Sequence, residues 1–266
     1  TCDREVVTEY SSTTSRAVIQ HDLTSGSNVY ASLSEGFKAG GYATYECTEP
    51  YDPEEVTSLE FGYKGSLGEN TSLNASLFRY DYTDFQVLQV VGIQTVTRNA
   101  GDATVNGLEL EALSNLNDSL SMSYGLTLLD ATYGEFLNTN GLEPQLGQQQ
   151  LEGKYLNNAP KVSVNLGLNY TTNLSSGSSL TYRANAAYKS KIYFSEFNEY
   201  SQSAYTIVDL NLIWESADDR MRTRFYVKNA TDEEYISGYL SSATGGGRFG
   251  QWGYPRTAGI EIQRNF

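Results

Sequence analysis

The sequence describes an acidic chain of 266 residues, with a formal net charge of −14 at pH 7 and an isoelectric point near 4.5. This charge argues against nucleic-acid binding, which relies on a basic patch that neutralises phosphates, and the chain has no basic stripe. A transmembrane helix is excluded as well, since no run of about 18 apolar residues occurs.

The composition favours strands and turns. The chain contains 21 tyrosines, 10 phenylalanines and 24 glycines but only 5 prolines, and 39% of its residues are hydrophobic. Aromatic rings, glycine turns and thinly spread apolar residues are typical of transmembrane β-strands, which combine aromatic girdles with a polar interior. A soluble β-sandwich fits the same composition, so both fold classes stay open at this point.

Alternating polarity predicts eleven strands along the chain. In chain order they are 15–23, 28–38, 54–67, 71–91, 93–113, 119–136, 162–170, 178–194, 204–215, 221–235 and 256–266. The fourth predicted strand has about 21 residues, roughly twice the length that a membrane crossing needs, so it should project beyond the bilayer. The clearest alternation is in 162–170, where Val164, Leu166 and Leu168 lie on one face. In the last strand, Ala258, Ile260, Ile262 and Phe266 share a face.

The predicted connections alternate between short and long. Turns near residues 24, 68, 115, 174 and 217 are short, whereas the segments after 38, 136, 194 and 235 are long, and only the hairpin near Gly92 departs from this order. Short periplasmic turns and long extracellular loops are typical of outer-membrane barrels. A sandwich has no reason to separate its loops in this way. The sequence therefore predicts an all-β fold, an antiparallel transmembrane β-barrel.

Charged residues occur on the strand face opposite the apolar stripe. They are Glu60, Lys64, Glu109, Glu111, Arg183, Lys189, Arg222, Arg224, Lys228 and Glu261. A lysine or arginine on a lipid-facing surface at mid-bilayer costs about 2–4 kcal/mol, so this face is expected to line a wet or protein-filled interior. The exterior of a soluble sandwich would show the same alternation.

Residues that carry chemistry are few. The single histidine, His21, lies in a predicted strand, and the chain has no GxSxG, HExxH or Walker-type motif, so neither an enzyme nor a bound cofactor or metal is predicted. Acidic residues gather in the loop at 46–55 without the spacing of a calcium loop, which favours a solvated loop. Cys2 and Cys47 could form a disulfide if the chain is exported.

Seven segments together resemble one known family. They are YASLSEGFKAGGY (30–42), PEEVTSLEFGYKGSL (53–67), ASLFRYDYTDFQV (75–87), RNAGDATVNGLELEA (98–112), NNAPKVSVNLGLNY (157–170), FYVKNATDEEY (225–235) and GYPRTAGIEIQRNF (253–266). In this order they are similar to the C-terminal barrel half of TonB-dependent outer-membrane receptors.

The resemblance implies the second half of a 22-stranded barrel, a size at which the lumen is plugged. Residues 1–266 would then be the C-terminal part of the receptor barrel, with 1–14 as the remnant of an extracellular loop, and the plug domain would be absent. Phe266 would be the C-terminal signal for the barrel-assembly machinery, although Arg264 departs from the usual aromatic or apolar residue. A Cys2–Cys47 disulfide would brace two extracellular loops.

The resemblance also implies TonB-coupled uptake of a scarce, bulky solute across the outer membrane of a Gram-negative cell, most readily a ferric siderophore, with cobalamin or an oligosaccharide as other solutes. The expected partners are outer-membrane lipid and lipopolysaccharide, the TonB complex through the plug, and the solute. Aromatic and cationic loop residues suit contact with a rigid ligand. Our candidates are Tyr42, Tyr45, Tyr239, Arg248 and Trp252. Tyr193, Phe194 and Tyr254 instead fit an interface girdle. The alternatives are a passive or adhesive barrel and a soluble extracellular β-sandwich that binds a ligand.

Overall fold

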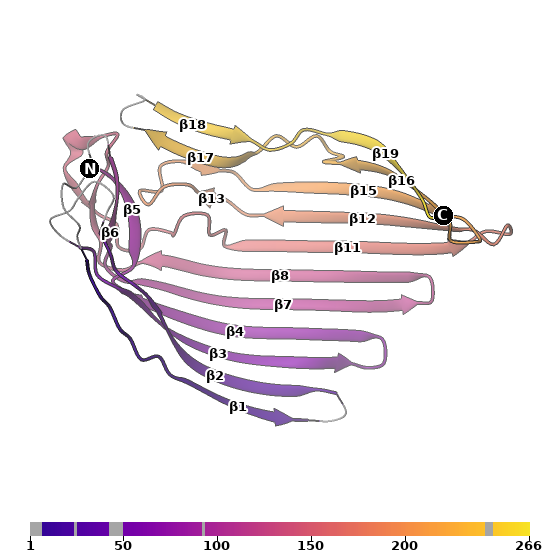
Figure 1. The fold of residues 1–266 in the computed structure, drawn as a ribbon, viewed down its shortest axis with the longest axis horizontal. Coiled ribbons are helices and arrows are strands. Elements are labelled where there is room, and N and C mark those ends of the chain that lie inside the picture. Colours follow the sequence, from indigo (N-terminus) through magenta and orange to yellow (C-terminus); the bar gives the residue numbers. More distant parts are fainter. Residues whose placement is uncertain (1–6, 24–25, 43–49, 92–93, 243–246) are drawn as a thin grey trace.

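One large antiparallel sheet dominates the computed structural model, which describes residues 7–23, 26–42, 50–91 and 94–242 together with 247–266 (Figure 1). Its eleven strands follow the chain order β1-β2-β3-β4-β7-β8-β11-β12-β15-β16-β19. Their bounds are β1 Arg16–Asp22, β2 Asn28–Lys38, β3 Glu54–Leu67, β4 Thr71–Thr83, β7 Ala103–Asn117, β8 Leu120–Tyr133, β11 Val162–Asn173, β12 Ser179–Lys189, β15 Tyr205–Glu215, β16 Met221–Lys228 and β19 Thr257–Arg264. The predicted number of strands in the main sheet is confirmed.

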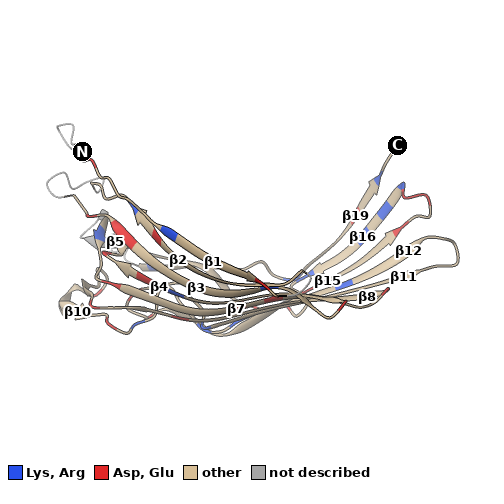
Figure 2. Ribbon diagram, turned by 90° about the horizontal axis from the view of Figure 1, so that it is seen from below, with Lys and Arg blue, Asp and Glu red and all other residues tan. Residues whose placement is uncertain are grey.

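The sheet curves into an open trough whose edge strands are β1 and β19 (Figure 2). All short connections lie at one end of the strands, which we call the turn end. The long connections lie at the other, which we call the loop end (Figure 1). No helix in the described part of the chain is long and apolar enough to cross a membrane.

Within the described ranges, four short hairpins lie at the loop end, each outside the main sheet. They are β5 Gln86–Val91 with β6 Gln94–Asn99, β9 Leu137–Thr139 with β10 Gln148–Gln150, β13 Ile192–Tyr193 with β14 Ser201–Gln202, and β17 Ile236–Ser242 with β18 Gly247–Trp252. A short 3-10 helix, η1 Pro144–Leu146, joins β9 to β10. The sequence predicted only a polar loop at 137–160, and that prediction was incomplete.

The predictions for the two longest strands were wrong in one respect. Residues 71–91 and 93–113 do not run on as single strands, because both are broken before the tip of the hairpin. Asp84 adopts a left-handed conformation with φ 52°, which an extended strand cannot contain. The next residue, Phe85, accepts a backbone hydrogen bond from Ala100 at 2.6 Å and turns the chain into the separate β5–β6 sheet.

Smaller boundary differences occur elsewhere. The strand that was predicted to end at residue 113 continues as β7 to Asn117, so the turn before β8 is shorter than expected. The strand predicted at 178–194 is divided into β12 and β13. The last strand ends at Arg264, so Phe266 lies beyond it and is fully exposed.

Register places the apolar stripe on one face of the sheet. Phe61 pairs with Leu77, Leu77 with Leu108 and Leu108 with Leu128 across neighbouring strands. We call this surface the apolar face and the other the polar face. On the polar face, the Arg224 guanidinium donates to Asn211 at 2.8 Å and lies 3.3 Å from the Glu261 carboxylate. The predicted two-faced alternation is therefore present across the sheet.

The apolar face has no second large sheet packed on it within the described residues. Leu166 and Leu210, which would fill the centre of a sandwich, are 47% and 44% exposed. The β-sandwich alternative is therefore wrong. A face of this kind needs an apolar surrounding, which a bilayer supplies.

Candidate ligand-contact site at the loop end

Most of the buried apolar side chains lie at the loop end of the sheet. Phe136, Leu151 and Phe197 are 4%, 0% and 6% exposed, and they form one cluster with Tyr133 and Ala100. A backbone hydrogen bond joins two segments of this cluster, since the Leu151 N–H donates to the Phe136 carbonyl oxygen at 2.8 Å. We call this cluster the loop core. It holds three of the hairpins against the rim of the sheet and so gives the loops a fixed shape.

An aromatic stack lies beside the loop core, centred on Tyr239 of β17. Its ring stacks on Phe194 at 5.8 Å and on Tyr200 at 5.1 Å between ring centroids. The Arg248 guanidinium of β18 lies 4.1 Å from the centroid of the Tyr200 ring, a cation–π distance. Glu143 forms an ion pair of 3.4 Å with the same guanidinium. Three loops therefore meet in one surface of rings and charge.

A small cavity of about 80 Å³ opens next to this stack. Its walls carry Thr139, Asn140, Ser195, Glu196, Phe197, Glu199, Tyr200 and Tyr239, among others. The Asn140 amide donates to the Glu199 carboxylate at 2.9 Å, and Asn138, from the same hairpin, donates to Glu196 at 3.1 Å. Two further polar atoms, Ser195 Oγ and Tyr239 OH, are buried and have no hydrogen-bond partner among the described residues. Both residues line the cavity, and because a buried polar atom without a partner is costly, each hydroxyl would gain from a hydrogen bond to a guest molecule.

Burial raises the pKa of the Glu196 carboxyl, and the neighbouring Glu199 carboxylate raises it further, while hydrogen bonds to Glu196 oppose this change. Burial also raises the pKa of the Tyr239 hydroxyl, with added effects of Glu199 and Glu196. Both shifts follow from low solvent access and excess negative charge. The cavity is therefore an acidic pocket in which protonated or positively charged groups are favoured.

The predicted contact residues fall in three places. Tyr239 and Arg248 both contact the Tyr200 ring in the aromatic stack. Trp252 lies at the other end of the same hairpin, opposite Ile236, and is 65% exposed. Tyr42 belongs to a different loop, next to the bridge between Gly41 and Tyr51. Tyr45, Cys2 and Cys47 lie outside the described residues.

Sequence reasoning missed the polar half of this site. Glu143, Glu196 and Glu199 come from two loops, and Asn138 and Asn140 from the hairpin that was not predicted. Their spacing gives no signal, because the contacts join residues that are far apart in the chain. Phe194, which was assigned to an interface girdle, stacks on Tyr239 in the site.

The acidic loop at 46–55 is only partly described. Within the described residues, Glu54 accepts a hydrogen bond from the Gln86 backbone N–H at 2.7 Å and lies 3.8 Å from the Lys38 ammonium. In the part of the chain that the structure describes, no group of three or more His, Cys, Asp or Glu residues is arranged to hold a metal ion. Glu54 therefore serves to attach the β5–β6 hairpin to the neighbouring strands.

Relatives of known name share this sequence at low identity. The pesticin receptor of Yersinia pestis is 26% identical over 250 residues, which cover 92% of this chain and 34% of the relative. The ferrioxamine B receptor of Salmonella typhimurium is 23% identical over 226 residues, which cover 84% of this chain and 30% of the relative. The chain thus spans about a third of the length of these curated relatives.

Solved structures share the fold. The ferric yersiniabactin uptake receptor of Yersinia pestis superposes with a TM-score of 0.78 at 24% identity, and the match covers 94% of this chain and 37% of that structure. The ferripyoverdine receptor of the outer membrane of Pseudomonas aeruginosa superposes with a TM-score of 0.68 at 18% identity, covering 94% and 32%. The family model described as "TonB dependent receptor-like, beta-barrel" matches residues 3–230. The chain therefore belongs to the TonB-dependent receptor β-barrel family, whose members are outer-membrane proteins of Gram-negative bacteria.

Proposed function

We propose that this chain forms the C-terminal half of a 22-stranded receptor barrel that takes up a ferric siderophore in a TonB-coupled step. The observation that carries the proposal is the surface made by Tyr239, Tyr200 and Arg248 at the loop end. Stacked rings and an oriented guanidinium suit a rigid chelate with flat aromatic or amide groups. The names of two similar proteins, a ferrioxamine B receptor and a ferric yersiniabactin uptake receptor, support the same class of activity.

The fold by itself leaves the solute open. A copper transporter superposes with a TM-score of 0.66 at 16% identity, so barrels of this shape serve different cargoes. The choice of a siderophore over cobalamin or an oligosaccharide rests on the relatives and on the chemistry of the loop end. Coupling would pass through a plug domain and the TonB complex, and assembly through the C-terminal strand and Phe266. A disulfide between Cys2 and Cys47 remains part of the proposal.

The first test measures uptake by a full-length receptor that carries this chain. Radiolabelled iron, supplied as a set of ferric siderophores, is expected to enter cells that produce the receptor. An uncoupler that removes the proton-motive force should stop entry. Uptake that persists without the proton-motive force would contradict the coupled mechanism and favour a passive barrel. Failure of every ferric siderophore to bind would contradict the choice of solute.

The second test measures binding at the aromatic stack. Tyr239→Ala and Arg248→Ala should each weaken siderophore binding at least tenfold, because truncation of a contact at an anchor residue costs about 2 kcal/mol or more. Leu240→Ala is the matched control, since this neighbouring side chain in β17 is 66% exposed. An equal loss for Leu240→Ala would show that the hairpin as a whole, and not the stack, determines binding.

A further inference from the structure

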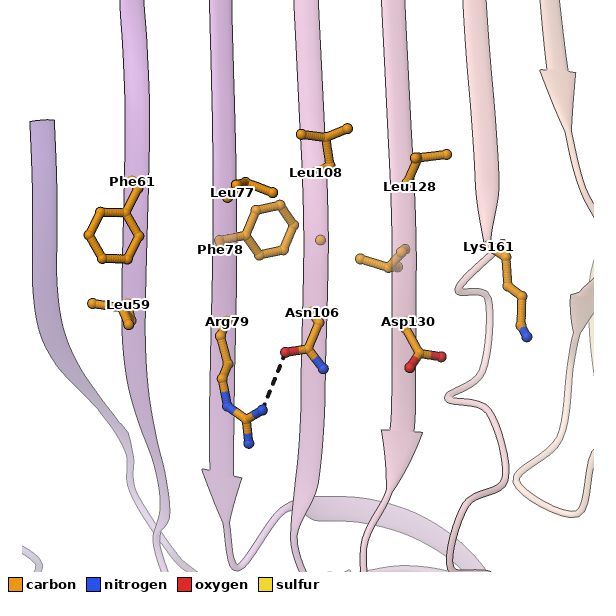
Figure 3. A pocket seen from close by; sticks show the side chains of 12 residues that line it. Leu59, Phe61, Leu77, Phe78, Arg79, Asn106, Leu108, Leu128, Asp130 and Lys161 are labelled. Atoms are coloured by element: carbon orange, nitrogen blue, oxygen red, sulfur yellow. Dashed lines mark hydrogen bonds between the residues drawn. The ribbon is translucent and has the colours of Figure 1, made fainter. Parts of the chain in front are cut away.

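Two hollows of this molecule differ in what they offer a ligand. The groove on the apolar face has a volume of about 540 Å³ and is lined by Leu77, Leu108 and Leu128, with polar side chains such as Asp130 at its loop end (Figure 3). The cavity beside the aromatic stack has only about 80 Å³, and its wall carries carboxylates, hydroxyl groups and rings. The small cavity is therefore the better candidate for the recognition of a polar group.

This cavity lies where four hairpins meet. Leu88 comes from β5, Thr139 from β9, Ser195 from the loop between β13 and β14, and Tyr239 from β17. Phe197 belongs both to the cavity wall and to the loop core, so the packing of the loop core also shapes the cavity. A site that is shaped before a ligand arrives binds with a smaller loss of conformational entropy.

Two buried asparagines orient the carboxylates of the cavity. Asn138 and Asn140 are 5% and 6% exposed, and their side-chain oxygens accept hydrogen bonds from nearby backbone N–H groups at 2.8 and 3.0 Å. Their amide nitrogens therefore face the carboxylates, and they donate to Glu196 at 3.1 Å and to Glu199 at 2.9 Å. Such bonds favour the charged form of a carboxylate. The β9–β10 hairpin thus holds two acidic groups in fixed positions.

The chain supplies no cation to these two groups. Among the described residues, no lysine, arginine or histidine lines the cavity, and neither Glu196 nor Glu199 has an ion-pair partner within 4.0 Å. Two cations of the loop end are engaged elsewhere, since the Lys154 ammonium donates to the Phe197 carbonyl at 2.8 Å and Arg248 has its own carboxylate partner. Glu196 is partly buried, so water compensates its charge only in part.

An ammonium group suits this cavity better than a metal ion. Calcium takes about six to eight oxygen ligands, and the described residues contain no group of three or more His, Cys, Asp or Glu side chains arranged around one point. An ammonium group needs only acceptors for its N–H bonds. Besides the carboxylates, the cavity offers the fully buried hydroxyl oxygens of Ser195 and Tyr239, which lack a hydrogen-bond partner among the described residues. The Tyr200 and Tyr239 rings add cation–π attraction.

The size of the cavity limits what can enter it. Pockets that enclose a whole small molecule have volumes of about 300–1,000 Å³, several times that of this cavity. Only an end group of a larger ligand therefore fits. Tyr200 and Tyr239 belong both to the cavity wall and to the aromatic stack. A rigid ligand that lies on the stack can thus place a short arm in the cavity.

We propose that the cavity binds the protonated amine at the end of a short arm of the solute, so that the receptor selects ferric siderophores with a cationic end group. The ammonium donates hydrogen bonds to the Glu196 and Glu199 carboxylates, and its third N–H is left for the hydroxyl oxygen of Ser195 or Tyr239. The chelate itself lies on the aromatic stack. This selection rests on the proposed function, because it requires a siderophore at this site.

The test measures Kd by titration calorimetry with the full-length receptor that carries this chain, purified in detergent. The probes are two ferric trihydroxamates that differ only at the end of one arm, which is a free primary amine in one and its N-acetyl derivative in the other. The ferric trihydroxamate core is neutral, so the end group carries the whole difference in charge. The amine should bind about 10-fold to 100-fold more tightly, the value of a hydrogen bond to a charged group. A matched pair of ferric tricatecholates repeats the comparison on an anionic core.

The double variant Glu196→Gln, Glu199→Gln tests the cavity itself. It should bind the amine about tenfold more weakly or worse and the acetylated chelate as before, and this retained binding reports that the loop end is folded. Asp130→Asn, Glu152→Gln removes the same charge from two exposed residues outside the cavity and should keep the preference for the amine. If the cavity variant binds neither chelate, Glu199→Gln alone, at an exposed residue, should reduce the preference. An unchanged preference in that variant overturns the proposal.

The outcomes separate this proposal from the proposed function. Equal binding of the amine and the acetylated chelate to the unaltered receptor overturns the choice of a cationic end group and leaves siderophore uptake in place. An equal loss of preference in the Asp130→Asn, Glu152→Gln variant overturns it as well, because the charge of the whole chain would then explain the selection. Failure of all four probes to bind contradicts the proposed function, and the selection of an end group falls with it.

Discussion

The sheet and the loop end of this molecule achieve order by different means. In the sheet, regular backbone pairing fixes the strands, and large apolar side chains such as Leu166 and Phe225 remain 47% and 45% exposed. At the loop end, the backbone is irregular, and side chains such as Phe136 and Leu151 are 4% and 0% exposed. The sheet therefore depends on its surroundings for apolar contact, whereas the loop end supplies its own.

This difference suggests that the sheet serves as the scaffold and that the packed loop end determines specificity. A strand that faces lipid on one side and a wet interior on the other can change side chains freely if polarity is kept. A packed cluster responds to the loss of a single methylene group. We expect substitutions on the sheet to act through polarity and substitutions in the loop core to act through shape.

The largest expected effect is at the loop core. Phe136→Ala removes a ring that contacts Tyr133 at 5.5 Å between centroids, and it should destabilise the loop end by about 3–5 kcal/mol. Limited proteolysis of the folded receptor should then cut within 137–160 while the strands stay protected. Leu137→Ala is the control, because the Leu137 side chain is 57% exposed. Unfolding of the whole barrel by Phe136→Ala would show that the two regions are not independent.

The next effect concerns the apolar face. Leu166→Arg should destabilise the membrane-inserted receptor by about 2–4 kcal/mol, the cost of an arginine that faces lipid near mid-bilayer. Asn165→Arg introduces the same group on the polar face of β11 and should cost much less. Denaturant unfolding from lipid vesicles measures both. Equal costs would mean that the assignment of the two faces is incorrect.

The strands could be predicted from the sequence because the two faces of the sheet have different surroundings. The period of two in Val164, Leu166 and Leu168 reflects an environment that differs on the two sides of each strand, so the polarity pattern alone carries the fold. The break at Asp84 was missed because the polarity pattern continues through it. Its cause is the positive φ of one residue together with the bonds of Phe85 to the return strand.

The candidate site was less accessible to prediction. Tyr239 and Arg248 were identified because aromatic and cationic loop residues suit a ligand, which is a statement about composition. Their partners Tyr200 and Glu143 come from loops whose positions depend on the loop core, and no local pattern encodes those contacts. Prediction therefore fails where order comes from tertiary packing and succeeds where it comes from the backbone.

A smaller effect should separate the regions by pH. The raised pKa of Glu196 means that burial favours its protonated form, so its stabilising contribution is complete below the unfolded-state pKa of about 4.3 and is lost as pH rises through the folded-state pKa. Hydrogen exchange of loop-end amides should therefore be faster at neutral pH than in mild acid, after correction for intrinsic rates. Glu196→Gln should remove this dependence, and Glu152→Gln, an exposed loop carboxylate, should retain it. A pH response at the strands of equal size would contradict a local origin.

The smallest expected change in stability comes from Tyr239→Phe, and it tests whether the loop core and the ligand surface have different tasks. The Tyr239 hydroxyl is buried without a hydrogen-bond partner among the described residues, so its removal should leave stability unchanged or raise it by less than about 1 kcal/mol. The ring and its stack on Phe194 and Tyr200 are kept. If the hydroxyl bonds the solute, siderophore binding should fall by about threefold to tenfold, the value of one hydrogen bond. Loss of binding without loss of stability would show that the loop end leaves this group unsatisfied for a ligand. Loss of both would instead assign the hydroxyl to the packing of the loops.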